Sequence, residues 1–307
     1  MEAKLKTSTL VETNLTKGKK PGALIRWVKL LLQSKTGTVG FFVVLGVIVV
    51  AIFADIIAPH DPTKNNLEAM LQPPVWLDGG TSTYILGTDN LGRDILSRII
   101  HGTRVSLLVG VFSVILAGII GIVVGIISGY YGGIIDNILM RIVDSFLAIP
   151  SILFILVVLA VFDPSIFVLI IVIGFTNWVT YARVVRSEVL SIKEREFVKA
   201  SRSIGTKNRT IMAKHIFPNI VSSFIVISTL SVATTIILEA SLSFLGLGIQ
   251  PPDVSWGGML TDGRNYLATN WWLATFPGIA ITVTVLGIIF LGDWLRDVLD
   301  PRIKGRK

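Results

Sequence analysis

Six long apolar runs constrain this chain of 307 residues more than any other feature of its sequence. A hydrocarbon core about 30 Å thick is crossed by about 20 helical residues at 1.5 Å per residue. Runs of that size lie at 38–58, 104–128, 137–162, 165–183, 219–245 and 271–292. Backbone groups in lipid must be satisfied within the segment, so each run is expected to be a helix. The sequence therefore predicts an all-α integral membrane protein with six transmembrane helices, the first of them uncleaved.

Composition and charge agree with a membrane protein. Hydrophobic residues make up 52% of the chain and charged residues only 16%, whereas a soluble domain is about 25% charged. The net charge of +8 does not indicate nucleic acid, because the basic residues gather beside the apolar runs. Those before the first run are Lys4, Lys6, Lys17, Lys19, Lys20, Arg26, Lys29 and Lys35.

The placement of basic residues predicts the sidedness of each segment. We expect a cytoplasmic N-terminal segment at 1–37, an extracytoplasmic segment at 59–103, and a basic cytoplasmic segment at 188–218 within the helical region 104–292. The stretch 246–270 contains only one basic residue, Arg264, and is expected outside. The tail 293–307 carries Arg296, Arg302, Lys304, Arg306 and Lys307, so both termini are predicted to be cytoplasmic.

Glycine and proline mark the ends and the packing of the runs. Turn signals follow the second, third and fifth runs at Gly132-Gly133, Asp163-Pro164 and Pro251-Pro252. The second run contains glycines that permit close approach of a neighbouring helix, namely Gly110, Gly118, Gly121 and Gly125. Pro150 predicts a kink in the third run, which serves either packing geometry or a gating hinge.

No catalytic, cofactor or metal pattern is visible in the sequence. There is no G-x-x-x-x-G-K-[ST] phosphate loop and no cysteine. His60, His101 and His215 lie far apart without an i, i+4 partner, so they do not predict a metal site. The polar run 87–94 lacks the alternating carboxylates and the closing glutamate of a calcium loop.

Ionisable residues at membrane depth are the first candidate functional groups. Ser228, Ser231, Thr235 and Glu239 fall on one face of the fifth run. That face either lines a translocation path or packs against a neighbouring helix, with Glu239 paired across the bundle. Arg141 and Asp144, three residues apart, are interpreted as a local ion pair.

The segment 188–218 gives the strongest local signal. Phe197, Ala200 and Ile204 recur at helical spacing among charged residues and predict a short amphipathic helix. Gly205 suits the left-handed residue after a helix end, and Thr206 is expected to cap a second short helix before Pro218 begins the fifth run. This helix-glycine-helix elbow is either a handle for an outside machine or a connector at the lipid headgroups.

At these residues the chain resembles the EAA loop of bacterial ATP-binding cassette (ABC) importer permeases. Lys199-Ala200-Ser201, Gly205 and His215-Ile216-Phe217-Pro218 follow the loop's order and spacing, with Lys199 in place of its glutamate. Flanking runs resemble the C-type permease subunit of the dipeptide/oligopeptide/nickel family. They are 86–94, 239–248, Pro251-Pro252, Ser255-Trp256-Gly257, Leu291-Gly292-Asp293 and Leu299-Asp300-Pro301-Arg302.

The resemblance implies a type I (MetI-like) permease fold and a set of partners. These are a homologous B-type permease, two ATPase subunits that hold ATP and Mg²⁺, and an extracytoplasmic solute-binding protein. It further implies that the elbow couples to an ATPase through Glu196, Phe197, Lys199, Ala200, Ser201, Ile204, Gly205 and Thr206.

Peptides are the expected cargo, with nickel, a metal chelate or glutathione as alternatives from the same family. From other classes, a self-sufficient secondary transporter or channel would show inverted repeats or a string of intramembrane carboxylates, and neither is visible. A membrane-bound enzyme would need a catalytic constellation that the sequence lacks.

Overall fold

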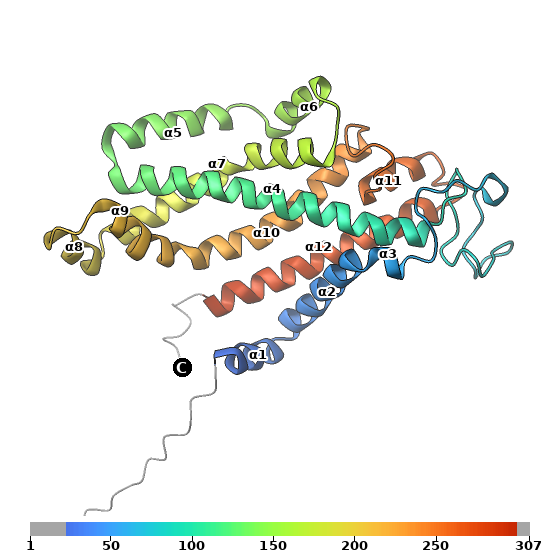
Figure 1. Cartoon of the computed structure of the whole chain (residues 1–307), viewed down its shortest axis with the longest axis horizontal. Helices are drawn as coiled ribbons and strands as arrows, with labels where there is room; N and C mark the ends of the chain where they lie inside the picture. The colour runs from blue at the N-terminus through green and yellow to red at the C-terminus, as the bar shows by residue number, and fades with distance from the viewer. Residues whose placement is uncertain (1–22, 300–307) are drawn as a thin grey trace, which may run out of the picture.

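The structure, a computed structural model, describes residues 23–299. Four long helices run side by side along the longest axis (Figure 1). They are α4 (Ile95–Tyr131), α7 (Ile166–Lys193), α10 (Phe217–Phe244) and α12 (Trp272–Leu299). Of the predicted basic segments 1–37 and 293–307, residues 1–22 and 300–307 lie outside the described residues.

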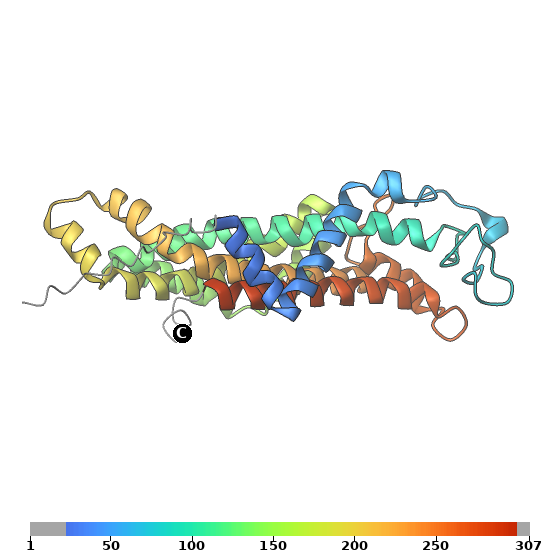
Figure 2. The same cartoon turned by 90° about the horizontal axis from the view of Figure 1, so that it is seen from below.

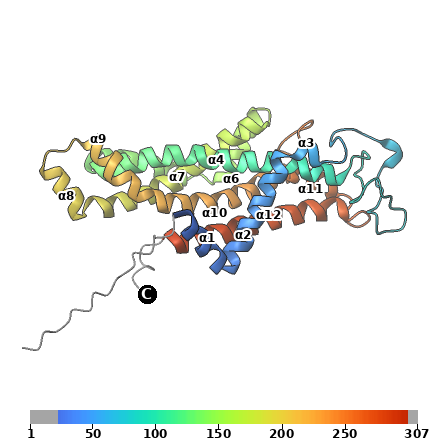
Figure 3. The same cartoon turned by 60° about the horizontal axis from the view of Figure 1, so that its bottom comes forward.

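Two N-terminal helices lie along one side of this group. α1 (Ala23–Gln33) leads into α2 (Lys35–Ile52), which crosses α12 obliquely (Figure 3). Glycines bring the two helices together, because a Cβ added at Gly40 would lie 2.8 Å from the carbonyl oxygen of Gly287. Most of α2 is nonetheless exposed apolar surface, as expected of a helix that faces lipid.

The third predicted run is broken rather than kinked. α5 (Gly133–Leu147) and α6 (Ser151–Val161) meet at 77° around Pro150. Proline lacks the backbone N–H of a continuing helix and disfavours helical geometry at the residue before it. The described residues contain five helices long and apolar enough to cross a membrane, and this bent pair as one span makes the six predicted.

Several helices extend past the ends of their apolar runs. α4 begins at Ile95 instead of 104, since Asp94 caps it by accepting a hydrogen bond from the backbone N–H of Ser97 at 3.1 Å. α7 likewise continues to Lys193 and α12 to Leu299. Charged residues end an apolar run without ending a helix, which is why hydropathy alone placed these boundaries too early or too late.

Glycines on one face of α4 allow α7 to pack closely, as the sequence predicted. A Cβ at Gly121 would lie 2.3 Å from the Cβ of Tyr181, and a Cβ at Gly125 would lie 2.7 Å from the Cβ of Val185. Gly129 continues the same face one turn further on. This small-xxx-small arrangement supports the most extensive helix contact of the fold.

Gly110 and Gly118 on α4 instead admit side chains of α10. A Cβ at Gly110 would lie 3.0 Å from Ile236, and one at Gly118 would lie 2.6 Å from the ring of Phe224. α4 therefore holds α7 and α10 together.

The connections gather at two opposite ends of the molecule (Figure 2). The loop end holds α3 (Ala54–Ile57), the turn η1 (Leu67–Ala69) and α11 (Trp256–Arg264). The elbow end holds α8 (Glu196–Ser203), α9 (Asn208–Ile211) and the π-helical turn η2 (Met212–Ile216).

Candidate functional site

Gly205 ends α8 in the left-handed conformation that the sequence predicted. Its φ is +78°, and its N–H donates to the carbonyl of Arg202 at 3.0 Å. The N–H of Thr206 reaches back to the carbonyl of Ser201 at 3.1 Å. These two bonds form a Schellman motif, which only a residue without a Cβ enters freely.

The expected cap of the next helix was wrong. α9 begins at Asn208 with Lys207 as its N-cap, and no side chain caps it. Thr206 instead completes the Schellman motif with its backbone, which leaves it one residue too early to cap α9. The chain then passes through η2 into α10, where Pro218 occupies the first turn as predicted.

Three fully buried apolar side chains anchor the elbow, defined as residues 194–218, to the bundle. Val198, Ile211 and Ile216 pack with residues of α4 and α7, including Val189. The last turn of α4 contributes Tyr130, whose hydroxyl donates to Asn208 at 2.8 Å. Its ring also lies 5.3 Å below the guanidinium of Arg202. The elbow is thus fixed to the long helices from several sides.

The predicted apolar face of α8 points away from the bundle. Phe197 is 40% exposed, Ile204 is 82% exposed, and Ala200 between them is exposed as well. Two sides of the helix are therefore apolar. Val198 packs against the protein, whereas the predicted face of Phe197, Ala200 and Ile204 stays exposed. Such an exposed apolar face is typical of a surface that docks into a partner.

The polar residues of the predicted coupling segment surround this face. Glu196 is exposed in the first turn of α8, and Ser201 donates to the carbonyl of Phe197 at 2.8 Å. Lys199 lies 3.0 Å from Glu194, and this hydrogen bond and charge hold the pKa of the Glu194 carboxyl below its ordinary value. A lowered carboxyl pKa means that the pair persists at neutral pH and is lost as the pH falls through that pKa.

The predicted polar stripe of α10 reaches α4 at Glu239. Glu239 is fully buried and accepts hydrogen bonds from Ser243 at 2.7 Å and from Ser106 of α4 at 3.5 Å. Thr235 is also buried, while Ser228 and Ser231 are half-buried. Within residues 23–299, the hydroxyls of Ser228 and Thr235 have no hydrogen-bond partner. Within this chain the stripe has the geometry of interhelical packing, and its lining of a path stays a prediction.

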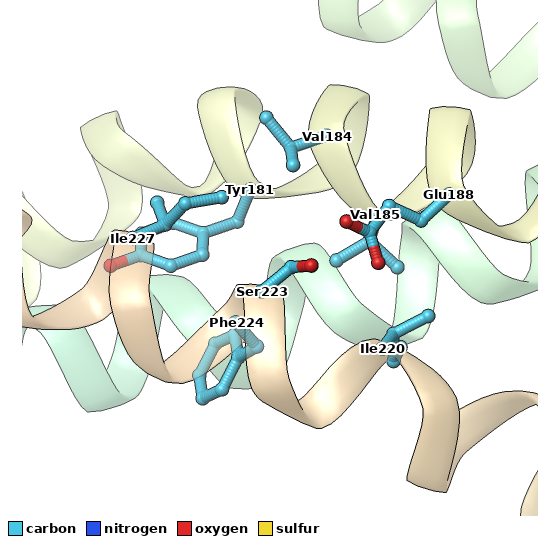
Figure 4. A pocket seen from close by; sticks show the side chains of 8 residues that line it. All are labelled: Tyr181, Val184, Val185, Glu188, Ile220, Ser223, Phe224 and Ile227. Atoms are coloured by element: carbon cyan, nitrogen blue, oxygen red, sulfur yellow. The ribbon is translucent and has the colours of Figure 1, made fainter. Parts of the chain in front are cut away.

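A small cavity lies between α7 and α10 towards the elbow end (Figure 4). Its volume is about 10 Å³, which is room for about one water molecule. The carboxylate of Glu188 and the hydroxyl of Ser223 lie on the same side of it, and Tyr181 closes the other side. The remaining walls are aliphatic or aromatic.

Ion pairs tie α5 to α7 and correct one prediction. Asp144 pairs with Arg183 at 2.5 Å, not with Arg141 on its own helix. Asp136 receives both Nε and Nη2 of Arg186 at 2.6 Å. The acidic residues of α5 therefore hold this helix to its neighbour, because both arginines lie on the face of α7 that α5 covers.

A charged network at the loop end was missed by the sequence reasoning. Asp89 pairs with Arg93, at 2.7 Å, and with Arg98 in the first turns of α4. Both guanidinium groups also reach Asp262 of α11, each at 3.1 Å. The four-residue spacing of Asp89 and Arg93 hinted at a pair, but Asp262 lies too far along the chain for any spacing rule to detect.

This network forms one wall of a cavity of about 580 Å³, which we call the loop-end cavity. Its other walls come from the segment before α4 and from the connection between α10 and α11. The polar run 87–94, which lacks the sequence pattern of a calcium loop, supplies part of the wall. It supplies no group of metal ligands. In the described residues no cluster of three or more His, Asp or Glu side chains has metal-binding geometry.

Comparisons with known proteins cover nearly the whole chain. Residues 121–305 match the family model described as binding-protein-dependent transport system inner membrane component. Residues 26–74 match the N-terminal transmembrane domain of oligopeptide transport permease C. The fold resembles an inward-facing structure of the MetNI methionine ABC transporter at a TM-score of 0.55, with 19% identity, over 66% of this chain and 96% of that one.

Curated relatives extend over both matched regions. The dipeptide transport system permease protein DppC of Escherichia coli K12 is 48% identical over 89% of this chain and 91% of its own length. The di/tripeptide permease protein DppC of Pseudomonas aeruginosa is 38% identical over 92% and 94%. A glutathione permease protein, GsiD of Escherichia coli O1:K1, is 42% identical over 91% and 90%. The chain therefore belongs to the family of binding-protein-dependent transport system inner membrane components, as a multi-pass permease subunit of an ABC importer whose ATPase is a separate subunit.

Proposed function

We propose that this chain and a homologous B-type permease together form a translocation path for di- or oligopeptides across the bacterial cytoplasmic membrane. Two ATPase subunits, holding ATP and Mg²⁺, drive the cycle, and an extracytoplasmic solute-binding protein delivers the cargo. The observation that carries the cargo assignment is the 48% identity to a dipeptide permease over 89% of this chain. Glutathione is the second candidate cargo, because a glutathione permease is 42% identical over 91% of the chain.

The elbow is the proposed contact with an ATPase subunit. Phe197, Ala200 and Ile204 would enter an apolar groove, with Glu196, Lys199 and Ser201 at its polar rim. Val198 supports this proposal, because its full burial fixes the exposed face to the long helices. Closure of the ATPase pair would then move α4 and α7 together with the elbow, and shift the permease pair between two packed states.

The proposed orientation places the elbow end in the cytoplasm and the loop end outside. Arg195, Lys199, Arg202, Lys207, Arg209 and Lys214 lie in the elbow, whereas 246–270 contains only Arg264. Both termini are then cytoplasmic, and the segment 59–94 before α4 faces the solute-binding protein. Ser228, Ser231, Thr235 and Glu239 remain the candidate residues of the path.

Uptake by the reconstituted complex tests the proposal. The four subunits are placed in proteoliposomes with ATP enclosed, and the solute-binding protein and a radiolabelled dipeptide are added outside. Dipeptide accumulation that requires ATP is expected, because the proposed ATPase subunits drive the cycle, and this chain carries no phosphate-binding loop that would let it use ATP alone. Proteoliposomes with this chain alone are the control, and dipeptide uptake by them would refute the importer assignment. Accumulation of glutathione but not dipeptide would replace the cargo.

A further inference from the structure

The loop-end cavity presents both signs of charge on one rigid wall. Arg93 and Arg98 line it, and Asp262 joins both guanidinium groups at 3.1 Å. Asp89, which is buried, fixes the two arginines from behind. Because each charge is held by at least two partners, the wall is organised before any ligand arrives.

Hydrogen-bonding capacity remains free on this wall. Arg93 uses Nε for Asp89 and Nη2 for Asp262, and within residues 23–299 its Nη1 donates to no protein group. Asp262 receives both arginines on Oδ2, and in the same part of the chain its Oδ1 has no donor. The Asp262 side chain is 36% exposed, so a molecule in the cavity can reach it. The Arg93–Asp262 pair thus offers a free cationic donor, Nη1 of Arg93, and a free anionic acceptor, Oδ1 of Asp262.

We propose that the loop-end cavity is a binding subsite for the charged termini of a short peptide, with Asp262 receiving the α-ammonium group and Arg93 the α-carboxylate. This inference rests on the proposed function and deepens it, since it places the cargo on this chain before translocation. A simple anion or cation would use only one of the two charges. A zwitterion uses both, and charge-assisted hydrogen bonds are the stronger kind.

The rest of the cavity suits a peptide whose side chains vary. Its volume of about 580 Å³ falls within the usual range of small-molecule sites, about 300–1,000 Å³. The remaining lining residues include Gln250, Pro251, Pro252, Asp253 and Gly258. The subsite therefore holds the two ends of a peptide at Asp262 and Arg93 and has room beside them for its side chains.

Protection of a single cysteine tests the subsite in the complete complex. The chain has no cysteine, so Thr63→Cys, at an exposed position on the cavity wall, gives one labelled site on this subunit. The complex is held in nanodiscs without the solute-binding protein. The rate at which maleimide labels this subunit, followed as its band on a gel, is measured with and without dialanine. Dialanine at about ten times its Kd is expected to slow labelling about tenfold. Thr83→Cys, exposed in the same segment but away from the cavity, should label at an unchanged rate.

The two ends of the ligand are then separated. N-acetylated and C-amidated dialanine should each protect Thr63→Cys about tenfold less well than dialanine, because each loses one charge-assisted hydrogen bond. Asp262→Asn should weaken protection by dialanine and leave protection by the N-acetylated peptide unchanged. Arg93→Gln should weaken protection by dialanine and leave protection by the C-amidated peptide unchanged. Lys64→Gln, which removes a nearby charge outside the cavity wall, should change neither.

Equal labelling rates with and without dialanine would overturn the subsite, as would equal protection by all three peptides in the Thr63→Cys complex. The second comparison needs no charge variant, so it holds even if Asp262→Asn fails to assemble. ATP-driven uptake that persists after either result would leave the proposed function standing. Uptake that fails while protection is seen would overturn the function and not the subsite.

Discussion

At the scale of single residues, two positions show how the environment decides the role of a side chain. Glu239 carries a carboxyl group with no exposed surface, held by Ser243 on its own helix and Ser106 on α4. Gly205 has nothing within 4 Å of the place where a Cβ would stand, yet its φ is +78°. Glu239 is thus constrained by its partners, whereas Gly205 is constrained by its backbone alone.

Replacing Glu239 tests the value of its hydrogen bonds. Glu239→Leu should lower the stability of the complex by about 1–3 kcal/mol, because it leaves buried hydroxyls unpaired. Glu239→Gln keeps an acceptor and should cost less. Thermal unfolding of the detergent-purified complex measures both, with Ser241→Ala, exposed on the same helix, as the control. Equal melting temperatures for the leucine and glutamine variants would contradict a hydrogen-bonding role.

Replacing Gly205 tests the elbow as a rigid coupling element. Gly205→Val places a β-branched side chain in the left-handed region, which costs about 1–2 kcal/mol and opens the Schellman motif. We expect reduced uptake and reduced cargo-stimulated ATPase activity with normal insertion into the membrane. Gly46→Val in α2, where a side chain also meets open space but the φ is not positive, is the matched control. Coupling equal to that of the parent chain in Gly205→Val would contradict the prediction.

At the scale of helices, close packing of α4 and α7 depends on a row of residues without side chains. A Cβ at Gly125 would come within 2.7 Å of Val185 and 2.8 Å of the carbonyl oxygen of Ala182. Without a hydrophobic driving force in lipid, such close contact is the main attraction between two helices. α5 is held to α7 by ion pairs as well, through Asp136 and Asp144, whereas α6 packs on α7 through the buried apolar residues Ile155 and Leu159.

Gly125→Leu should separate α4 from α7 and prevent assembly of the permease. The carbonyl of Ala182 belongs to a helix backbone and cannot move aside, so the helices must shift apart or rotate. Recovery of the complex by size-exclusion chromatography measures the loss. Gly46→Leu adds the same side chain to α2 at an open position and should leave recovery unchanged.

The same scale shows what could be predicted from the sequence. The apolar runs, the α4 glycines and the turn at Gly205 follow from local rules, and the structure has all of them, although α4, α7 and α12 extend past their runs and the third run is broken at Pro150. Arg98 and Asp262, 164 residues apart, meet only because α11 returns beside the start of α4. No local pattern signals such a pair, and the Asp144–Arg183 pair between α5 and α7 was missed for the same reason.

At the scale of the whole molecule, the two ends of the longest axis differ in the charged residues that they carry. The elbow end is rich in basic residues, and the loop end carries the charged network and its cavity. α4 contributes to both, since Arg98 lies in its first turns and Tyr130 in its last. The proposed sidedness of the protein depends on this arrangement.

Cysteine labelling checks that sidedness. Ala200→Cys at the elbow and Asn265→Cys at the loop end are both exposed positions in a chain without native cysteine. In intact cells, a membrane-impermeant maleimide should label Asn265→Cys, and it should label Ala200→Cys only after the membrane is opened. Labelling of both positions in intact cells would contradict the topology.

The length of α4 has a mechanical consequence. Its 37 residues form one unbroken rod about 55 Å long. Because this rod joins Asp262 at one end to Asn208 at the other, neither end can swing without the other responding. A tilt of about 5° about its midpoint carries each tip by about 2–3 Å in opposite directions. The proposed binding of cargo at the loop end and the proposed ATPase contact at the elbow would thus be connected by one stiff helix rather than by a series of flexible contacts.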